Sequence, residues 1–236
     1  MRELIKRSFR RIGIDVGNAR YRRDLMDFFA AREIDLVLDV GANTGQFGSS
    51  LRTKGYRGKI ISFEPISSVF ETLATQARAD GNWEARHFAV GAVSEKALIN
   101  VADSTVFSSL LEANSAATRY CEAAATSRQE TIEVRRLDDL FPDLSGNVLL
   151  KIDTQGYERQ VLEGGSHVLP RLKGILMELP IINLYEGSWK LHEALAFMSD
   201  AGFVPAQIQP VNFHSMDDVS LVEVDCLFRP RDARLD

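Results

Sequence analysis

Short apolar segments alternate with amphipathic segments along most of this 236-residue chain. The apolar segments have the length of β-strands, and the segments between them carry apolar residues at helical spacing. This alternation is typical of an α/β fold in which a mostly parallel sheet has helices on both faces. The predicted strands are residues 35–40, 59–63, 84–89, 98–102, 131–137, 148–153, 174–179, 203–209 and 221–228.

Two features of the pattern refine this prediction. The run 148–153 is very apolar, as expected of a strand that a parallel sheet buries on both faces. The last two strands follow each other closely and predict a C-terminal antiparallel hairpin at the sheet edge. We therefore expect a Rossmann-like, doubly wound, seven-stranded sheet, with residues 98–102 and 131–137 bracketing an irregular Ser/Ala-rich insert. One predicted helix follows the first strand and ends near residue 54, and the others cover residues 67–79, 157–164 and 189–201.

Basic residues crowd the amino terminus, where apolar residues recur at roughly helical spacing. We predict a helical extension over residues 1–30 and a single domain over residues 31–236. The extension could cover the domain with a solvated basic face, or it could contact a membrane surface or a polyanion. A homodimer is also left open. The basic residues are Arg2, Lys6, Arg7, Arg10, Arg11, Arg20, Arg22 and Arg23, and the apolar ones are Leu4, Ile5, Phe9 and Ile12.

Composition excludes several classes of protein. With 45% hydrophobic and 26% charged residues, the chain has the profile of a globular protein with a core. Its net charge of −5 argues against a protein that holds nucleic acid by its phosphates. Cys121 and Cys226 match no metal-ligand spacing, and no signal peptide is evident, so we expect reduced thiols in a cytoplasmic protein. No apolar run approaches the roughly 20 residues of a membrane span.

The first predicted strand ends in a glycine loop that leads into a helix. Such a loop lets a ligand approach the backbone, with the helix N-terminus directed at it. A dinucleotide fingerprint would need further glycines, which this loop lacks. The carboxylate of Asp39 would repel a pyrophosphate, whereas it would attract the sulfonium and amino groups of S-adenosylmethionine. We predict a site for that cofactor at Asp39, Gly41, Ala42, Asn43 and Gly45.

A second acid follows the second strand at the spacing of a nucleoside site. Glu64 lies about twenty residues after Gly41, where doubly wound folds place the acid that accepts hydrogen bonds from ribose hydroxyls. Pro65 follows it directly. Ala89 and Val90, at the end of the third strand, are expected to offer small apolar surface to the adenine.

At this point the sequence resembles the FkbM family of methyltransferases, which includes nodulation proteins that methylate fucose. The most specific match is the run Leu150-Lys151-Ile152-Asp153-Thr154-Gln155-Gly156-Tyr157-Glu158. The resemblance extends over about residues 34–229. The other matching stretches are residues 37–47, 61–65, 107–111, 136–138 and 184–187.

The resemblance implies S-adenosylmethionine as cofactor and O-methylation as the reaction, with hydroxyls of sugars, glycolipids, polysaccharides or polyketides as acceptors. The sequence departs from the family pattern at Asp103-Ser104, where an Asn-Ser pair is usual, and in residues 179–183. Both departures lie where an acceptor could bind. We expect a glycan acceptor, with a polyketide or another small molecule as the alternative.

Methyl transfer to a hydroxyl needs a general base, a metal that acidifies the hydroxyl, or both. Asp153 and Glu178 end neighbouring predicted strands, so their carboxylates should emerge at one edge beside the cofactor. Asp153 is thus a predicted cofactor contact as well as a catalytic residue. The two acids, joined by Glu158, would suit Mg²⁺. A helix cap at Asp153 and a structural ion pair at Glu178 are the alternatives.

The base itself has more than one candidate among the histidines. His214, in the loop between the last two strands, could overhang the cofactor edge and is the third predicted catalytic residue, with His192 as an alternative. Serines in the insert and two residues after Glu178 are candidate acceptor contacts. These predicted contacts are Ser108, Ser109, Tyr185 and Glu186.

Three rival functions share parts of this pattern. An amino-methyltransferase acting on nucleic-acid bases would carry an Asn/Asp-Pro-Pro-aromatic motif where Asp153-Thr154-Gln155-Gly156-Tyr157 stands. A nicotinamide oxidoreductase is disfavoured by the missing glycines and by Asp39. A cofactor-binding partner subunit without catalysis stays open.

Overall fold

The computed structural model describes residues 24–213 and 219–233. The chain divides into two compact units, Met1–Glu33 and Ile34–Asp236, which are described separately. Most of the helical extension predicted over residues 1–30 lies outside the described residues, so its surface contacts stay predictions.

The described part of the first unit holds one α-helix, α2 (Leu25–Arg32). Its N-terminus is capped by Asp24, whose carboxylate accepts hydrogen bonds from the backbone N–H groups of Met26 and Asp27. Such a cap satisfies donors that have no partner within the helix.

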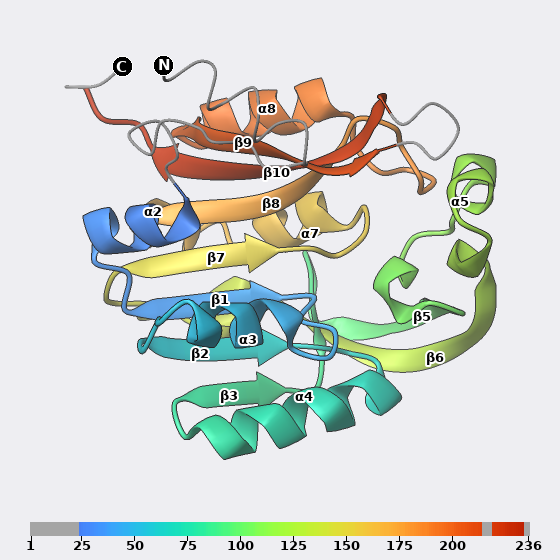
Figure 1. Ribbon diagram of the computed structural model, residues 1–236, viewed down its shortest axis with the longest axis horizontal. Coiled ribbons are helices and arrows are strands. Elements are labelled where there is room, and N and C mark those ends of the chain that lie inside the picture. Colours follow the sequence, from blue (N-terminus) through green and yellow to red (C-terminus); the bar gives the residue numbers. More distant parts are fainter. Residues whose placement is uncertain (1–23, 214–218, 234–236) are drawn as a thin grey trace, which may run out of the picture. The chain divides into compact units, whose positions relative to one another are not determined.

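Seven described strands of the second unit form one sheet (Figure 1). The first five strands in spatial order run parallel to one another, the sixth runs antiparallel to the fifth, and the seventh runs antiparallel to the sixth. The predicted Rossmann-like sheet with a C-terminal antiparallel hairpin is therefore confirmed. In spatial order the strands are β3 (Trp83–Arg86), β2 (Lys59–Phe63), β1 (Leu36–Val40), β7 (Val148–Ile152), β8 (Gly174–Pro180), β10 (Leu221–Pro230) and β9 (Phe203–Phe213).

Helices cover both faces of this sheet, α3 and α4 on one and α7 and α8 on the other (Figure 1). All five residues of β7 are buried, as the prediction for residues 148–153 requires of a central strand. No helix within the described residues is both long and apolar enough to cross a membrane. The bounds are α3 (Gln46–Thr53), α4 (Ser67–Asp80), α6 (Leu137–Leu140), α7 (Glu158–Glu163), η4 (Leu169–Arg171) and α8 (Leu191–Asp200).

A second, three-stranded sheet corrects the prediction for residues 84–89. This run is split, because β3 ends at Arg86 and β4 (Ala89–Val90) pairs with β6 (Thr126–Arg135) and not with the main sheet. β5 (Glu95–Ala102) completes the sheet by pairing antiparallel with β6. The chain pattern does not reveal the split, since buried Phe88 continues the apolar run between the two strands.

The insert between β5 and β6 lies beyond the carboxyl ends of the parallel strands (Figure 1). It holds three short helical segments, and a β-bridge joins its Ala113 to Tyr185 in the loop after β8. The insert therefore faces the edge of the sheet where cofactors bind in doubly wound folds. Its segments are η2 (Thr105–Phe107), α5 (Ser115–Tyr120) and η3 (Glu122–Ala124).

Close packing of two glycines holds the second sheet against α7. A Cβ atom at Gly164 would collide with the backbone carbonyl of Gly91. We expect Gly164→Ala to lower the free energy of unfolding by about 1–3 kcal/mol, measured by urea denaturation. Glu163→Ala, at the exposed neighbouring position, should change it by less than about 0.5 kcal/mol. Equal effects of the two substitutions would contradict this assignment.

Candidate functional site

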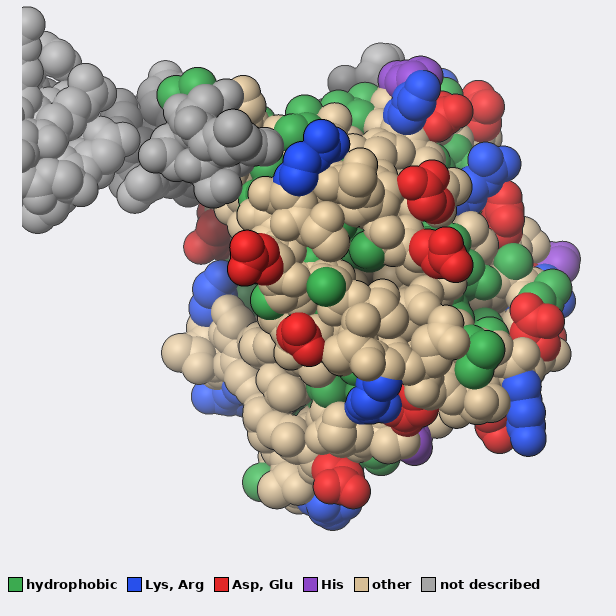
Figure 2. Space-filling view, turned by 90° about the vertical axis from the view of Figure 1, so that its right-hand side faces the viewer, with side chains coloured by type: hydrophobic (Ala, Val, Ile, Leu, Met, Phe, Trp, Pro, Cys, Tyr) green, Lys and Arg blue, Asp and Glu red, His purple; other side chains and the backbone are tan. Residues whose placement is uncertain are grey.

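A cavity of about 510 Å³ opens at the carboxyl ends of the parallel strands. The ends of β1, β2, β7 and β8 form its floor, and η2 of the insert lines the opposite side. Figure 2 views this end of the molecule, and several Asp and Glu side chains lie near the middle of the face. A ligand binding here would touch residues from both sheets and from the β9–β10 hairpin.

The glycine loop after β1 forms one end of the cavity. Three of the predicted cofactor contacts line it: Gly41, Ala42 and Asn43. Gly41 has a φ of 73°, and a Cβ atom there would collide with the carbonyl oxygen of Asp153. Only glycine allows the loop to pass so close to the end of β7. Gly45 is placed differently from the prediction, because it packs toward Leu73 and Trp83 and away from the cavity.

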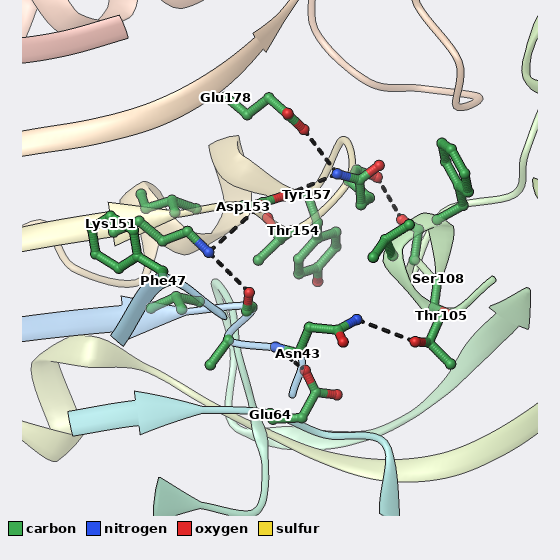
Figure 3. A pocket seen from close by; sticks show the side chains of 18 of the residues that line it. Asn43, Phe47, Glu64, Thr105, Ser108, Lys151, Asp153, Thr154, Tyr157 and Glu178 are labelled. Carbon is green, nitrogen blue, oxygen red and sulfur yellow. Dashed lines mark hydrogen bonds and ion pairs between the residues drawn. The ribbon is translucent and has the colours of Figure 1, made fainter. Parts of the chain in front are cut away.

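Glu64 stands at the end of β2 beside this loop (Figure 3). It is 4% exposed, and its two carboxylate oxygens accept hydrogen bonds from the backbone N–H groups of Asn43 (2.9 Å) and Ile66 (2.8 Å). Burial raises the pKa of Glu64 to about 7, although both hydrogen bonds favour the ionised form. The predicted residues Pro65, Ala89 and Val90 line the cavity next to it.

Asp39 requires a correction, because it lies beneath the cavity and does not line it. Its side chain is fully buried, accepts a hydrogen bond from Ser62 Oγ (2.9 Å) and pairs with Lys151 Nζ (3.3 Å). Strand alternation directs Asp39 into the layer between sheet and helices, so it cannot meet a cofactor directly. Its charge acts through the lysine.

Lys151 is a central residue that the sequence reasoning missed. It is 8% exposed, donates a hydrogen bond to the carbonyl oxygen of Gly41 (3.0 Å) and pairs with both Asp39 and Asp153. Figure 3 shows Lys151 beside Asp153. Burial opposes its charge, but the carboxylates of Asp153 and Asp39 raise the pKa of Lys151 above its usual value. The sequence offered one sign of this role, a lysine within an otherwise apolar strand. A lysine buried in such a strand needs an anion buried nearby.

Four carboxylates line the cavity at the ends of β7, β8 and β10: Asp153, Glu178, Glu223 and Asp225. Glu178 stands opposite Asp225 in the antiparallel register. Burial and the neighbouring carboxylates raise the pKa values of Glu178 and Glu223, and that of Asp225 to about 6. The sequence reasoning named Asp153 and Glu178 but missed the pair on β10. The signal was two acids at alternate positions of an apolar strand, which share one face.

Asp153 and Glu178 do come together, and the side-chain amide of Gln155 joins them. Gln155 Nε2 donates hydrogen bonds to Asp153 Oδ1 and Glu178 Oε2, each at 2.9 Å. Within the described ranges no three His, Cys, Asp or Glu side chains are arranged to hold a metal ion. Glu158 turns back to bind the backbone of its own loop. The predicted Mg²⁺ site therefore finds no support.

The predicted acceptor contacts divide into three groups. Ser108 and Ser109 line the cavity, and Ser109 Oγ donates to the backbone carbonyl of Gln155 (2.7 Å). Tyr185 is buried behind the wall, where its hydroxyl donates to Gln155 Oε1 (2.9 Å), and Glu186 is exposed outside the cavity. His214 lies outside the described residues, so its catalytic role stays a prediction.

The sheet order and the position of the cavity define a class I methyltransferase fold. Residues 39–205 match the methyltransferase FkbM domain, which is more than half of the chain. The chain belongs to the FkbM methyltransferase family. No curated protein shows a significant match.

Solved structures resemble this chain at low sequence identity. One is a methyltransferase FkbM from Methylobacillus flagellatus KT, with 16% identity, a TM-score of 0.52 and coverage of 84% of this chain and 44% of that one. LepI in complex with S-adenosylmethionine is 11% identical, with a TM-score of 0.49 and coverage of 92% and 49%. Aeropyrum pernix fibrillarin with natively bound S-adenosylmethionine is 14% identical, with a TM-score of 0.45 and coverage of 82% and 66%. The chain thus spans less than half the length of the Methylobacillus protein.

The buried pair of Lys151 and Asp39 makes the site sensitive to loss of the lysine. Lys151→Met leaves the Asp39 carboxylate buried without a counterion, and breaking such a pair costs about 3–5 kcal/mol. We expect urea denaturation of Lys151→Met to show a free energy of unfolding lower by that amount. The double variant Asp39→Asn/Lys151→Met should recover most of it, since no charge is then stranded. A double variant as unstable as the single one would contradict the pairing.

Proposed function

We propose that this protein is an S-adenosylmethionine-dependent O-methyltransferase acting on a sugar hydroxyl. The observation that carries the proposal is one cavity that has Glu64 beside small apolar residues at one end and four carboxylates at the other. Membership of the FkbM family supports methyl transfer, while the cofactor and the acceptor are inferred from the chemistry of the cavity.

The nucleoside end offers the groups that the cofactor needs. The carboxylate of Glu64 can accept hydrogen bonds from ribose hydroxyls, and Pro65, Ile66 and Ala89 offer apolar surface to the adenine. The methionine part would then extend past Gly41 toward Asp153. A negative edge there attracts the sulfonium and ammonium groups and disfavours a pyrophosphate.

The other end suits a neutral, hydroxyl-rich acceptor. Carboxylate and amide groups of Glu223 and Asn212 can bind hydroxyls, and Phe107 and Tyr120 offer aromatic surface to a sugar ring. No Lys, Arg or His among the described residues lines the cavity apart from Lys151, which is already paired. An acceptor carrying phosphate or carboxylate groups would find no counterion here.

The reaction would proceed by in-line displacement. The acceptor oxygen forms a bond to the methyl carbon, the carbon–sulfur bond breaks with its electron pair leaving on sulfur, and the hydroxyl proton passes to a carboxylate. Glu178 and Asp153 are the acids placed to receive it. A polyketide hydroxyl is the alternative acceptor, and a non-catalytic cofactor-binding subunit is the alternative function.

The cofactor assignment predicts pH-dependent binding of S-adenosylhomocysteine, measured by isothermal titration calorimetry. We expect micromolar affinity that falls as the pH drops below about 7, because protonated Glu64 loses acceptors for the ribose. Glu64→Gln should bind at least about tenfold more weakly and show a flatter pH dependence. No binding to the unsubstituted protein at any pH would refute the proposed function.

The reaction is tested with S-adenosylmethionine and a panel of methyl glycosides, followed by mass spectrometry for the gain of one methyl group. Neutral glycosides should react, and the corresponding uronic acids should not. Glu178→Gln should lower kcat by about 100-fold or more while keeping affinity for S-adenosylhomocysteine. Glu186→Gln, a matched change outside the cavity, should leave kcat unaltered. Methylation of polyketide hydroxyls alone would favour the alternative acceptor.

A further inference from the structure

Gln155 has an unusual backbone conformation at the centre of the cavity wall. Its φ of 54° lies in the left-handed region, and Gly156 follows with a φ of 95°. A left-handed backbone is strained for a residue other than glycine, so it persists only where surrounding contacts hold it. Glu158 supplies part of that hold, because its Oε1 accepts hydrogen bonds from the backbone N–H groups of Thr154 and Gly156.

This conformation directs the Gln155 amide between two acids. Its nitrogen donates to Asp153 on one side and to Glu178 on the other, at 2.9 Å each. Figure 3 shows the dashed lines from both labelled acids meeting at one nitrogen. The amide nitrogen has two N–H groups, so each carboxylate can receive one of them.

The remaining polar atoms of Gln155 are held as well. The Tyr185 hydroxyl has two acceptors, Gln155 Oε1 (2.9 Å) and the backbone carbonyl of Phe107 (3.0 Å), which share its one proton. Carboxylates only accept hydrogen bonds, so the amide lies with its nitrogen toward the acids and its oxygen toward Tyr185. Ser109 of the insert donates to the Gln155 backbone carbonyl at 2.7 Å. One residue thereby connects the end of β7, the end of β8, the insert and the loop after β8.

A neutral amide is the side chain that this position requires. Two carboxylates on one edge repel each other, and without donors between them they would turn apart or share a proton. A glutamate at position 155 would add to the repulsion, while a lysine or arginine would cancel the negative charge. The amide donates to both carboxyl groups and so opposes part of the burial and repulsion that raise the pKa of Glu178.

We propose that Gln155 is a positioning residue for methyl transfer, which holds the carboxyl groups of Asp153 and Glu178 toward the cavity, where they face the positively charged sulfur of the methyl donor. Tyr185 acts through Gln155 by fixing the orientation of the amide. The inference rests on the proposed function, because it needs S-adenosylmethionine in the cavity. This role explains why a glutamine in a left-handed turn stands in the Thr154-Gln155-Gly156 run, directly after Asp153.

Two ligands that differ by one charge test this role. S-Adenosylmethionine carries a sulfonium, whereas S-adenosylhomocysteine has a neutral thioether in the same position. If the two acids lose their position, the affinity for S-adenosylmethionine should therefore fall, while the affinity for S-adenosylhomocysteine should stay the same. Calorimetric dissociation constants for both ligands are compared in the unsubstituted protein, Gln155→Leu, Tyr185→Phe and the control Gln160→Leu, a glutamine on α7 that does not line the cavity.

We expect Gln155→Leu to bind S-adenosylmethionine about tenfold more weakly, with S-adenosylhomocysteine changed by less than about twofold. Tyr185→Phe should show the same selective loss at about threefold, and Gln160→Leu should show none. Retained S-adenosylhomocysteine binding also demonstrates that each variant is folded.

Equal weakening of both ligands in Gln155→Leu would make Gln155 a structural residue and overturn the proposal. An unchanged ratio of the two dissociation constants in both Gln155→Leu and Tyr185→Phe would overturn it too. Failure of the unsubstituted protein to bind either ligand is a different result, because it refutes the cofactor assignment itself.

Discussion

The buried ammonium group of Lys151 is the interaction on which the rest of the site depends. It joins Asp39 of β1, the Gly41 carbonyl of the glycine loop and Asp153 at the end of β7. A charge taken out of water is costly unless its partners surround it, so these three elements must hold one relative position. The glycine loop and the acidic edge are thereby fixed to each other, which is what a ligand spanning both would need.

The acidic edge is a second constraint, and it opposes the first. Asp153, Glu178, Glu223 and Asp225 bring like charges into a partly buried cavity, where burial and mutual repulsion favour protonation. Lys151 and the Gln155 amide offset part of that cost. The negative charge that remains at this edge attracts a cation, and the sulfonium of the proposed donor would supply one.

The second sheet gives the cavity its remaining wall. The chain leaves the main sheet after β3, and β4 pairs with β6 in the second sheet. The insert between β5 and β6 then lies over the strand ends, where Ser109 Oγ donates a hydrogen bond to the Gln155 carbonyl. The same hydrogen bond thus belongs to the wall that would face an acceptor and to the turn that carries the acids. The proposed acceptor site and the alignment of the acids would therefore share one structural element.

The sequence by itself determined the fold class, the hairpin, the glycine loop and the place of Glu64, because each depends on periodicity or spacing within a short stretch of chain. The tertiary structure alone decided which charges meet. Lys151 reaches the Gly41 carbonyl across 110 positions, and Asp225 stands opposite Glu178 only through the antiparallel register of β10 with β8. The burial of Asp39 and the split after Arg86 likewise follow from strand pairing. Local patterns predict where strands form, but contacts between charges depend on strand order and register, which the chain fixes only when it packs.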